Sequence, residues 1–585
     1  MRKIIQLLTI FCLSMKAFGS VSAKGLHIFN IPPCDGDATI ILQNVIDSVG
    51  ELKGEPAVIK LGEGDYNISR DNSTEALYHI SNTASLEEYP EQIRHIGLLI
   101  RNIQNLTIQG EGTRIVTHGE MTPFVIDSCV NICVENLTIT AADPTVTEIR
   151  ILENNDTTII FETLPFTNFE INDGIFQFVG NGWSFGDPAS GRYAWAQVYY
   201  PETNVTKRIG WSPFSGYKSA SSVASGIVRL DYDKAPSVAP GEIYQFRHWI
   251  RNEVGGFINL SKDITLRNVK FNYLGNFGLL SQYSENITLD KILCAPDENS
   301  GRTNAGFADF LHFSGCKGKV KISDSYFCGA QDDGINIHGT HLKIIERESD
   351  NRFKVRFMHP QSFGFTPFFA GDEIEIVNAS TLNSVHGARV KTLERIDDYN
   401  FIVEIDTPIS LQSLPEDDMV IENVTYTPEV EITGNRFERI PTRGILITTR
   451  KKSLIENNTF VKMPMAAILV ADDAASWYES GPVKDLTIRG NTFVECTPPN
   501  IMIAPEIKRV EDPVHTGIKI EDNTFYIYSE NIININGADD VTVKNNIFYT
   551  PFHSNSYINA SDLIRLTDSN NITIKDNRLE SIELF

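Results

Sequence analysis

A short phrase recurs through the second half of this chain and constrains its fold more than any other feature. The phrase has the form apolar-Thr-apolar-x-x-Asn-x-Phe, with a variant copy that ends at Cys294, and successive copies are about 23 or about 32 residues apart except for one much longer gap. Its copies end at Phe271, Phe327, Phe437, Phe460, Phe493, Phe525 and Phe548. Self-similarity at such a period is typical of a solenoid. Short β-rich segments with Asn at turns, and no helical periodicity, indicate parallel strands. We therefore expect an all-β chain folded as a right-handed parallel β-helix.

Two stretches interrupt this repeat with strict alternation, for example "TEIRILENNDTTIIFETL" and "HLKIIERESDNRFKVRFMHP". Such alternation is typical of antiparallel strands, so we expect two inserted β-barrel-like domains at residues 143–255 and 340–427. The solenoid then comprises residues 24–142, 256–339 and 428–585. Insertions at the same end of neighbouring coils would form the walls of a binding groove.

The N-terminus has the pattern of a secretory signal peptide. Basic residues precede an apolar stretch from Ile4 to Met15, and small residues end at Ala23. We expect cleavage after Ala23, so that residues 1–23 are removed and the protein is exported to the periplasm or the extracellular space. The apolar stretch is too short for a membrane span, and no other stretch approaches one.

Composition excludes several functions. The chain has 585 residues and a formal charge of −24, which loss of Arg2, Lys3 and Lys16 with the signal peptide would take to about −27. Such an acidic protein is a poor partner for nucleic acid, an anionic membrane or a polyanionic sugar. The cysteines have no CxxC spacing, which argues against a structural zinc site or a disulfide framework. At apolar repeat positions, Cys294, Cys316 and Cys328 are expected to be buried thiols.

One stretch, "GAQDDGINIHG" at residues 329–339, places two carboxylates side by side. Equivalent residues of adjacent coils lie about 4.8 Å apart, so the coils can be stacked by hand. "ADFLHFSG" aligns with "DDGINIHG" without a gap, which sets Asp309 beneath Asp333 and His312 beneath Asn336. Asp333 has the inward parity of Ile335. We expect a bend at Gly334 that keeps this carboxylate out of the core.

The next coil, "TRGILITT", places Arg443 over Asp333, and Asn276 falls about one coil below Asp309. Three carboxylates, Asp309, Asp332 and Asp333, thus converge with one guanidinium. The stacking also nominates substrate-binding residues, namely Arg443, His312, Asn336 and His338. Each of these could instead be a ladder or supporting residue, and an Asp-Asp-Gly triplet could be an ordinary turn or part of a calcium-binding ladder.

Two carboxyl groups with different pKa values are what glycoside hydrolysis needs. Stacked Asp309 and Asp333 could jointly hold a water molecule as general base. Asp332 is displaced sideways and pressed against like charges, so it is the better candidate for a protonated general acid. The spacing of adjacent coils allows carboxyl groups at either of the two typical separations. It therefore does not show whether the configuration at the anomeric carbon is inverted or retained. Tryptophans of the first insertion could stack on sugars or fill a barrel core; they are Trp183, Trp195, Trp211 and Trp249.

The "QDDGI" motif resembles the three-aspartate site of the polygalacturonase-like β-helix hydrolases. Over nearly the whole chain the sequence more closely resembles glycoside hydrolase family 110, in "FADFLHFSGC", "GAQDDGINIHGTHL" and the two interrupting barrels. That resemblance implies an exo-acting, inverting α-1,3-galactosidase without metal or cofactor, acting on branched blood-group B glycans and in some members on linear ones. It places the catalytic aspartates at Asp309, Asp332 and Asp333, with Asp332 as acid.

Two other functions compete with this interpretation. A β-helix polysaccharide lyase, or a polygalacturonase, would act on uronic acids and would place several cations near the acids, whereas only Arg443 is evident. A non-catalytic carbohydrate-binding solenoid would use its polar faces and leave the aspartates incidental. The sequence does not indicate an oligomeric state.

Overall fold

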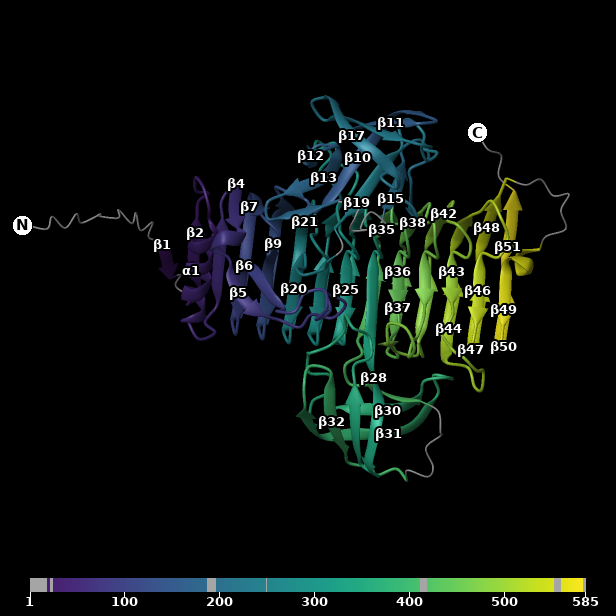
Figure 1. The fold of residues 1–585 in the computed structure, drawn as a ribbon. Coiled ribbons are helices and arrows are strands. Elements are labelled where there is room, and N and C mark those ends of the chain that lie inside the picture. Colours follow the sequence, from purple (N-terminus) through teal and green to yellow (C-terminus); the bar gives the residue numbers. More distant parts are fainter. Residues whose placement is uncertain are drawn as a thin grey trace, which may run out of the picture.

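Parallel coils of β-strand stack along one axis to form the body of the molecule (Figure 1). This computed structural model describes residues 18–21, 25–186, 196–248, 250–410, 418–551 and 559–581. The predicted all-β fold, a parallel β-helix with two antiparallel insertions, is confirmed. A single α-helix of more than one turn occurs in the described ranges, α1 (Thr39–Gly50), and it packs its apolar face on the first coils. None of the helices in these ranges is long and apolar enough to cross a membrane.

Each complete coil contributes strands to three parallel faces. The first face contains β2 (His27–Ile31), β3 (Ala57–Leu61), β7 (Gln104–His118), β9 (Val130–Ala141), β21 (Lys262–Phe271), β23 (Glu285–Asp290), β26 (Lys317–Ser323), β34 (Glu429–Thr433), β37 (Ser453–Glu456), β41 (Leu486–Arg489), β44 (His515–Glu521), β47 (Ala538–Lys544) and β50 (Asn570–Lys575). The second contains β4 (Gly64–Ser69), β24 (Leu293–Cys294), β27 (Tyr326–Cys328), β35 (Arg436–Glu438), β38 (Thr459–Val461), β42 (Thr492–Val494), β45 (Thr524–Tyr526), β48 (Ile547–Thr550) and β51 (Arg578–Ser581).

The third face carries the strands that position the candidate site. Its parallel strands are β6 (Ile93–Arg101), β8 (Thr122–Asp127), β20 (Gly256–Asn259), β22 (Leu279–Gln282), β25 (Leu311–Ser314), β28 (Ile335–Ser349), β36 (Ile445–Ile447), β39 (Ile468–Val470), β43 (Ile501–Ile503), β46 (Ile533–Asn536) and β49 (Ile564–Thr567). Shorter elements flank the three faces: β1 (Phe18–Val21), β5 (Thr74–Leu77), β40 (Glu479–Ser480) and the 3-10 turns at Arg70–Asn72 and Ala560–Leu563.

The repeated Phe and Asn of the sequence phrase form two ladders inside the solenoid. Rings of Phe437, Phe460, Phe493, Phe525 and Phe548 stack with centroids 4.6 to 5.0 Å apart. Five buried Asn side chains each donate Nδ2 to Oδ1 of the next coil's Asn at 2.9 to 3.0 Å, namely Asn435, Asn458, Asn491, Asn523 and Asn546. Asn577 accepts the last of these bonds and donates to the carbonyl of Val543. Each coil thereby satisfies the polar groups of its neighbour, which lets the same phrase recur.

The first insertion forms an antiparallel seven-stranded sheet in the order β16-β15-β19-β10-β11-β18-β17, with a separate sheet β12-β13-β14. Its strands are β10 (Val146–Asn155), β11 (Thr158–Thr163), β12 (Asn168–Asn172), β13 (Ile175–Gly180), β14 (Trp183–Phe185), β15 (Ala196–Tyr200), β16 (Val205–Ile209), β17 (Tyr217–Ala224), β18 (Ile227–Tyr232) and β19 (Ile243–Arg247). The two sheets share a core rich in Phe, including Phe161, Phe176 and Phe214.

The second insertion closes into a six-stranded antiparallel barrel, with each strand paired to the next in the order β28-β29-β32-β31-β30-β33. Strand β28 runs without a break from the solenoid into this barrel, and the others are β29 (Arg352–Arg356), β30 (Glu373–Asn378), β31 (Ser384–Arg395), β32 (Asn400–Ile405) and β33 (Met419–Asn423). Arg450 of the solenoid pairs with Glu375 and Glu422 of the barrel.

The two insertions project from opposite sides of the solenoid, the first at the top and the second at the bottom of the view (Figure 1). The expectation that both would wall a groove from the same end is therefore wrong. The first insertion lies at the N-terminal ends of the third-face strands, because its β15 side chain Gln197 donates to the carbonyl of Ala330 at 2.9 Å. It is this insertion that approaches the Asp-Asp-Gly stretch.

The remaining sequence predictions have mixed outcomes. Cys294, Cys316 and Cys328 are buried as predicted, and the seven cysteines in the described ranges are free thiols. The expected signal peptide falls mostly outside the described residues; only β1 of it is described, paired antiparallel with β2, and cleavage stays a prediction. Trp183 packs against Phe185 and Trp211 against Tyr244, while Trp195 and the side chain of Trp249 lie outside the described part.

Candidate active site

The strand register places the predicted residues in the predicted stack. Leu311 pairs with Ile335 and His312 with Asn336, and Ile335 in turn pairs with Ile445. Counting back two residues sets Asp309 beside Asp333 and Arg443 over Asp333. The prediction for Asn276 is wrong by one residue, since Leu279 pairs with Leu311 and brings Phe277 to the level of Asp309.

Asn276 itself takes no part in the carboxylate cluster. Its φ is +57°, and its side-chain amide donates to Glu120 Oε1 at 2.7 Å and accepts from Thr145. It therefore belongs to a neighbouring polar group near His248, which is 2.6 Å from Glu120.

Gly334 is needed for close approach of two coils. A Cβ at this position would lie 2.6 Å from the carbonyl oxygen of Gly444 and 3.0 Å from Ile440 and Phe437. The backbone of Gly334 donates to Arg443 O at 3.0 Å, which begins the parallel pairing of β28 with the next coil. Any side chain here would push the coils apart and displace the adjacent Asp333.

Asp333 is 1% exposed and fully engaged by the coil above it. Its Oδ1 accepts from the Thr442 hydroxyl at 2.5 Å and from the Arg443 backbone amide at 3.0 Å. Its Oδ2 accepts from Arg443 Nη2 at 2.8 Å. A buried carboxylate with these partners is held in one orientation.

Asp332 is more exposed than its two neighbours and faces arginines. Arg208 Nη2 lies 2.5 Å from Asp332 Oδ2, and Arg251 Nη2 lies 3.9 Å from the same oxygen. Burial alone would raise the pKa of this carboxyl, but Arg208, Arg443, Arg251 and Arg247 outweigh it and lower the pKa. The premise that like charges keep Asp332 protonated is thus wrong for the free protein, where it is ionised.

The first insertion and the segment after it supply arginine side chains that could not be located by stacking the coils. Arg208 lies on β16, Arg247 ends β19, and Arg251 follows in the return to the solenoid. Arg208 also donates through Nη2 to the backbone carbonyl of Gln331 at 2.9 Å, and Arg247 donates to the carbonyl of Phe307. The expectation of a single cation near the acids is wrong. The run "FRHWIRNE" before the solenoid resumes is the one sequence signal that could have suggested it.

Asp309 connects the cluster to a buried histidine pair. Its Oδ1 accepts from the Asp333 backbone amide at 3.2 Å, and its Oδ2 lies 2.9 Å from His312 Nδ1. His312 Nε2 lies 2.8 Å from His338 Nε2, and His338 Nδ1 lies 2.6 Å from the carbonyl oxygen of Gly339. Both rings are buried, so His312 and His338 lie behind the aspartates.

Glu479 completes this side of the site, and no sequence pattern pointed to it. It lies on β40, which pairs antiparallel with β28 through Thr340. Its Oε1 lies 3.6 Å from His338 Nε2 and accepts from Asn82 Nδ2 at 2.9 Å, and Asn336 Nδ2 donates to its Oε2 at 3.4 Å. Burial raises the pKa of Glu479, but the histidines and these amides outweigh it and lower the pKa.

Asp309 and Asp333 have pKa values near neutrality. Burial, followed by the charge of Asp332, raises the pKa of Asp309 to about 7. Burial also raises the pKa of Asp333 to about 7, helped by Asp332 and Asp309 and opposed by Arg443. Two adjacent acids with such pKa values lose their protons around neutral pH, whereas the lowered pKa of Asp332 keeps that carboxyl an anion.

Within the described ranges, two groups of residues bring three potential metal ligands within 4.8 Å of one another: His312, His338 and Glu479, and the three aspartates. The two imidazole nitrogens are at the distance of a direct hydrogen bond, and Asp332 is already paired with Arg208. Each group is thus satisfied by protein partners, and the expectation of a metal-independent site stays a prediction.

An aromatic pair lies near Glu479. The Trp477 ring stacks on His359 of the second insertion, with centroids 4.0 Å apart and an interplanar angle of 27°. Trp477 is 38% exposed, and its backbone amide is held by Asp473. Sequence reasoning considered only the tryptophans of the first insertion and missed this one.

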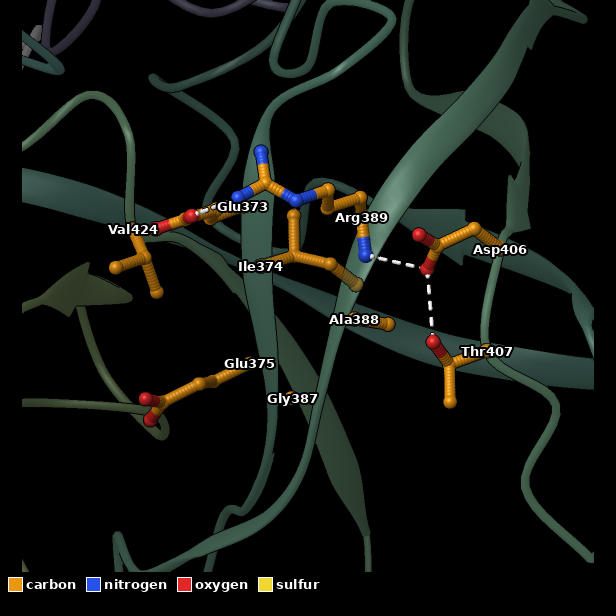
Figure 2. A pocket seen from close by; sticks show the side chains of 9 residues that line it. All are labelled: Glu373, Ile374, Glu375, Gly387, Ala388, Arg389, Asp406, Thr407 and Val424. Carbon is orange, nitrogen blue, oxygen red and sulfur yellow. Dashed lines mark hydrogen bonds and ion pairs between the residues drawn. The ribbon is translucent and has the colours of Figure 1, made fainter.

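A depression of about 350 Å³ on the second insertion is a separate feature (Figure 2). Its charged groups satisfy one another: Arg389 pairs with Glu373, and its backbone amide donates to Asp406 at 2.9 Å. No catalytic candidate lines it. The chemistry-bearing residues gather instead at the three stacked coils.

Taken together, these residues can perform acid–base chemistry on a bound sugar. Three carboxylates offer the proton donor and the proton acceptor that glycosidic cleavage needs. Four arginines and the amides of Asn82 and Asn336 offer donors for sugar hydroxyls. The predicted substrate-binding residues Arg443, His312, Asn336 and His338 all lie at the cluster. Arg443 and His312 contact aspartates, and His338 contacts His312 and the carbonyl of Gly339. Two of their buried polar atoms have no hydrogen-bond partner among the described residues, Asn336 Oδ1 and Arg443 Nε.

Two family models match parts of this chain. A family model described as GLAA-B beta-barrel domain II matches residues 352–420, and one described as right handed beta helix region matches residues 420–583. The chain is 44% identical to Alpha-1,3-galactosidase A of Bacteroides thetaiotaomicron, covering 96% of this chain and 97% of that protein. It is 40% identical to Alpha-1,3-galactosidase A of Bacteroides fragilis (84% and 81% covered) and 31% identical to Alpha-1,3-galactosidase B of Phocaeicola vulgatus (96% and 97%).

Among solved structures, the chain is similar to the A-module of the Azotobacter vinelandii mannuronan C-5 epimerase AlgE4, with a TM-score of 0.36, 9% identity, and 94% and 96% of the two chains covered. It is also similar to the catalytic unit of the GH87 α-1,3-glucanase from Streptomyces thermodiastaticus, with a TM-score of 0.34, 12% identity, and 94% and 68% covered.

Proposed function

Since this chain belongs to the α-1,3-galactosidases of glycoside hydrolase family 110, we propose that it removes terminal α-1,3-linked galactose from glycans as an exo-acting, inverting enzyme. The observation that carries the proposal is the carboxylate cluster, in which Asp332 stands apart from the stacked pair of Asp309 and Asp333. Relatives named for this activity over nearly the whole chain support it.

In this proposal Asp309 and Asp333 hold a water molecule and act together as the general base. A pKa of about 7 suits that role, because a base works best when its pKa lies near the working pH. Arg443 and Thr442 keep Asp333 in one orientation, and His312 does the same for Asp309.

Asp332 acts as the general acid. To do so it must acquire a proton that it does not hold in the free protein. Arg208 is what stabilises Asp332 as an anion, and its side chain is 32% exposed. We propose that the entering sugar displaces Arg208 into contact with its hydroxyls. The pKa of Asp332 then rises, and Asp332 takes up a proton from solvent, while both base carboxylates are ionised.

The stereochemical outcome rests on the family resemblance. One oxygen of each carboxylate lies within 4.8 Å of one oxygen of each of the other two. Inverting glycosidases typically separate their two carboxyl groups by roughly 6.5 to 9.5 Å. The anomeric form of the first galactose released is therefore a sharp test. Proton NMR should show β-galactose first; early α-galactose would mean retention.

The proposed substrates are branched blood-group B glycans and linear α-1,3-galactosyl glycans. A terminal sugar suits a site whose carboxylates are mostly buried between the solenoid and the first insertion. The stacked Trp477–His359 pair near Glu479 offers a platform for the sugar next to the terminal galactose.

The direct test is galactose release from four matched substrates: a branched B-type oligosaccharide, a linear α-1,3-digalactoside, and the α-1,4- and α-1,6-linked digalactosides. We expect release from the first, and from the second if the site is open to unbranched glycans, with none from the other two. Equal cleavage of all linkages, or none, would contradict the proposal. The four arginines favour one alternative, a uronic acid substrate, so an oligogalacturonide belongs in the same assay.

A further inference from the structure

A chain of hydrogen bonds leads from the base carboxylate away from the sugar and into the protein. It runs from Asp309 Oδ2 to His312 Nδ1 (2.9 Å), from His312 Nε2 to His338 Nε2 (2.8 Å), and from His338 Nδ1 to the carbonyl oxygen of Gly339 (2.6 Å). Glu479 Oε1 lies 3.6 Å from His338 Nε2. His312 is 0% exposed and His338 is 2% exposed.

The acceptors and donors of this chain fix how many protons it holds. A carbonyl oxygen only accepts, so His338 Nδ1 carries a hydrogen. If both rings are neutral, His338 Nε2 is then an acceptor, His312 Nε2 must donate to it, and His312 Nδ1 must accept from a protonated Asp309. If Asp309 is ionised, the same proton must sit on one of the imidazoles. Every link is therefore satisfied by one mobile proton shared among Asp309, His312 and His338.

We propose that His312 and His338 form a proton relay behind the general base Asp309, with the carboxylate of Glu479 beside it. This inference rests on the proposed function and extends it to residues that do not contact the sugar. They are positioning residues in the sense that they act through Asp309. Glu479 places a carboxylate 3.6 Å from His338 Nε2, beside the end of the relay that is farther from Asp309.

The proton balance of one turnover shows where the relay acts. Water forms a bond to the anomeric carbon and gives a proton to Asp309, while the glycosidic bond breaks and its oxygen takes the proton of Asp332. One proton thus enters the relay at Asp309, and one proton returns from the relay to solvent before the next turnover, while Asp332 regains a proton from solvent. No oxidant, reductant or metal is needed.

Other charged groups also face the residues of the relay and influence where its proton lies. Asp309 faces Asp332, Arg251 and Arg443, and His312 faces Arg251 and Asp332 as well as His338 and Glu479. The ring of Phe277 closes the remaining side of His312 at 5.0 Å between centroids. These neighbours stay unchanged in the variants below, so a change in the pH profile is due to the relay itself.

Kinetics with α-galactosyl fluoride isolate the base, because fluoride leaves without a proton from Asp332. We compare His338→Gln, which hydrogen-bonds but carries no charge, with His341→Gln as a matched control. His341 is a buried histidine of the same strand that bonds to the carbonyl of Asp473 outside the relay. We expect His338→Gln to lower kcat by about 10- to 100-fold with KM within about twofold. In mixtures of water and deuterium oxide, kcat of the wild type should vary with the deuterium fraction along a curve, whereas kcat of His338→Gln should vary linearly.

Glu479→Gln gives a second, directional readout. Glu479 is an anion beside the relay, and without it the relay binds protons less tightly. The acidic limb of the pH profile of kcat/KM should therefore move to lower pH. A limb that does not move, or a His338→Gln variant that behaves like His341→Gln, would overturn the relay. So would one equivalent of divalent metal in the purified protein that disappears in His338→Gln.

A readout without turnover separates the relay from the proposed activity. In protein labelled with ¹⁵N-histidine, His338 should be protonated at Nδ1 and a single proton should be shared between the two Nε2 atoms. Two imidazoles without such a shared proton would overturn the relay even in an active enzyme. Failure to release galactose from any α-1,3-linked substrate, with the shared proton present, would contradict only the proposed function.

Discussion

The C-terminal coils and the coils that carry the carboxylates share one strand register but use it differently. In the C-terminal coils an identical Asn recurs at each level, and each amide satisfies the next. In the site coils Asp309, Asp333 and Arg443 occupy one column. The neighbouring Asp332 is paired with Arg208 of the first insertion, and His338 lies beside Glu479 of β40. Repeated residues add stability coil by coil, whereas the unique ones place charge where chemistry needs it. Substitutions in the site coils should therefore lower turnover, whereas substitutions in the C-terminal coils should lower stability.

The largest effect is expected at the site, on chemistry. Asp332→Asn should lower turnover of an α-1,3-digalactoside by about 10³-fold, within the range for loss of a general acid or base. It should largely spare α-galactosyl fluoride, whose leaving group needs no proton. Asp333→Asn should lower turnover of both substrates. Steady-state rates on the two substrates check this, and the reverse pattern would exchange the acid and base roles.

The next largest effect is expected in the Asn ladder, on stability. Asn491→Ala removes the partners of Asn458 and Asn523 and strands buried donors, so the free energy of unfolding should fall by about 3 kcal/mol. Turnover at 25 °C should be unchanged in the folded protein. Lys519→Ala, at an exposed position of the neighbouring coil, is the control and should stay within about 0.5 kcal/mol. Denaturant unfolding measures both; an equal effect of the two would contradict the ladder account.

A smaller effect is expected at the cation that the first insertion places in the site. Arg208→Ala removes the strongest charge that lowers the pKa of Asp332, so that pKa rises. The acid then stays protonated to higher pH, and the alkaline limb of kcat/KM should move up by about one pH unit or more, each unit being about 1.4 kcal/mol. Arg208→Lys should largely restore the limb. A pH–rate profile that keeps its alkaline limb in Arg208→Ala would contradict this role.

The smallest effect is expected in the pH dependence of stability. The folded pKa of Asp309 is about 7, raised above its unfolded value. The folded state therefore binds more protons than the unfolded state between those values, and stability falls as pH rises through this window. Asp309→Asn removes the cost of the buried anion. Its melting temperature should exceed that of the wild type by about 2 to 3 °C at pH 8, with little gain near pH 4. A gain independent of pH would contradict the assignment.

Much of the solenoid and the core of the site could be predicted because a parallel register repeats. Once Leu311 is aligned with Ile335, the positions of Asp309, Asp333 and Arg443 follow from counting. The misplacement of Asn276 by one residue shows the limit, since a left-handed residue alters the count just outside the strand.

The surroundings of Asp332 could not be predicted, because they depend on how an insertion docks. Arg208 and Arg251 are distant from the aspartates in sequence, and no repeat relates them to a coil position. Glu479 reaches the site through an antiparallel pairing with β28 that breaks the parallel pattern. The sequence therefore indicated which carboxylates meet but not which of them is ionised.

A crystal structure of the Asp332→Asn variant with a bound α-1,3-galactosyl oligosaccharide would distinguish the acid from the base. We expect the terminal galactose between residue 332 and the Asp309–Asp333 pair. The glycosidic oxygen should lie within hydrogen-bond reach of residue 332, and Arg208 should have moved onto the sugar. A water should lie against Asp309 and Asp333 on the other side of the anomeric carbon. A galactose bound elsewhere, or a glycosidic oxygen facing Asp309 or Asp333, would contradict it.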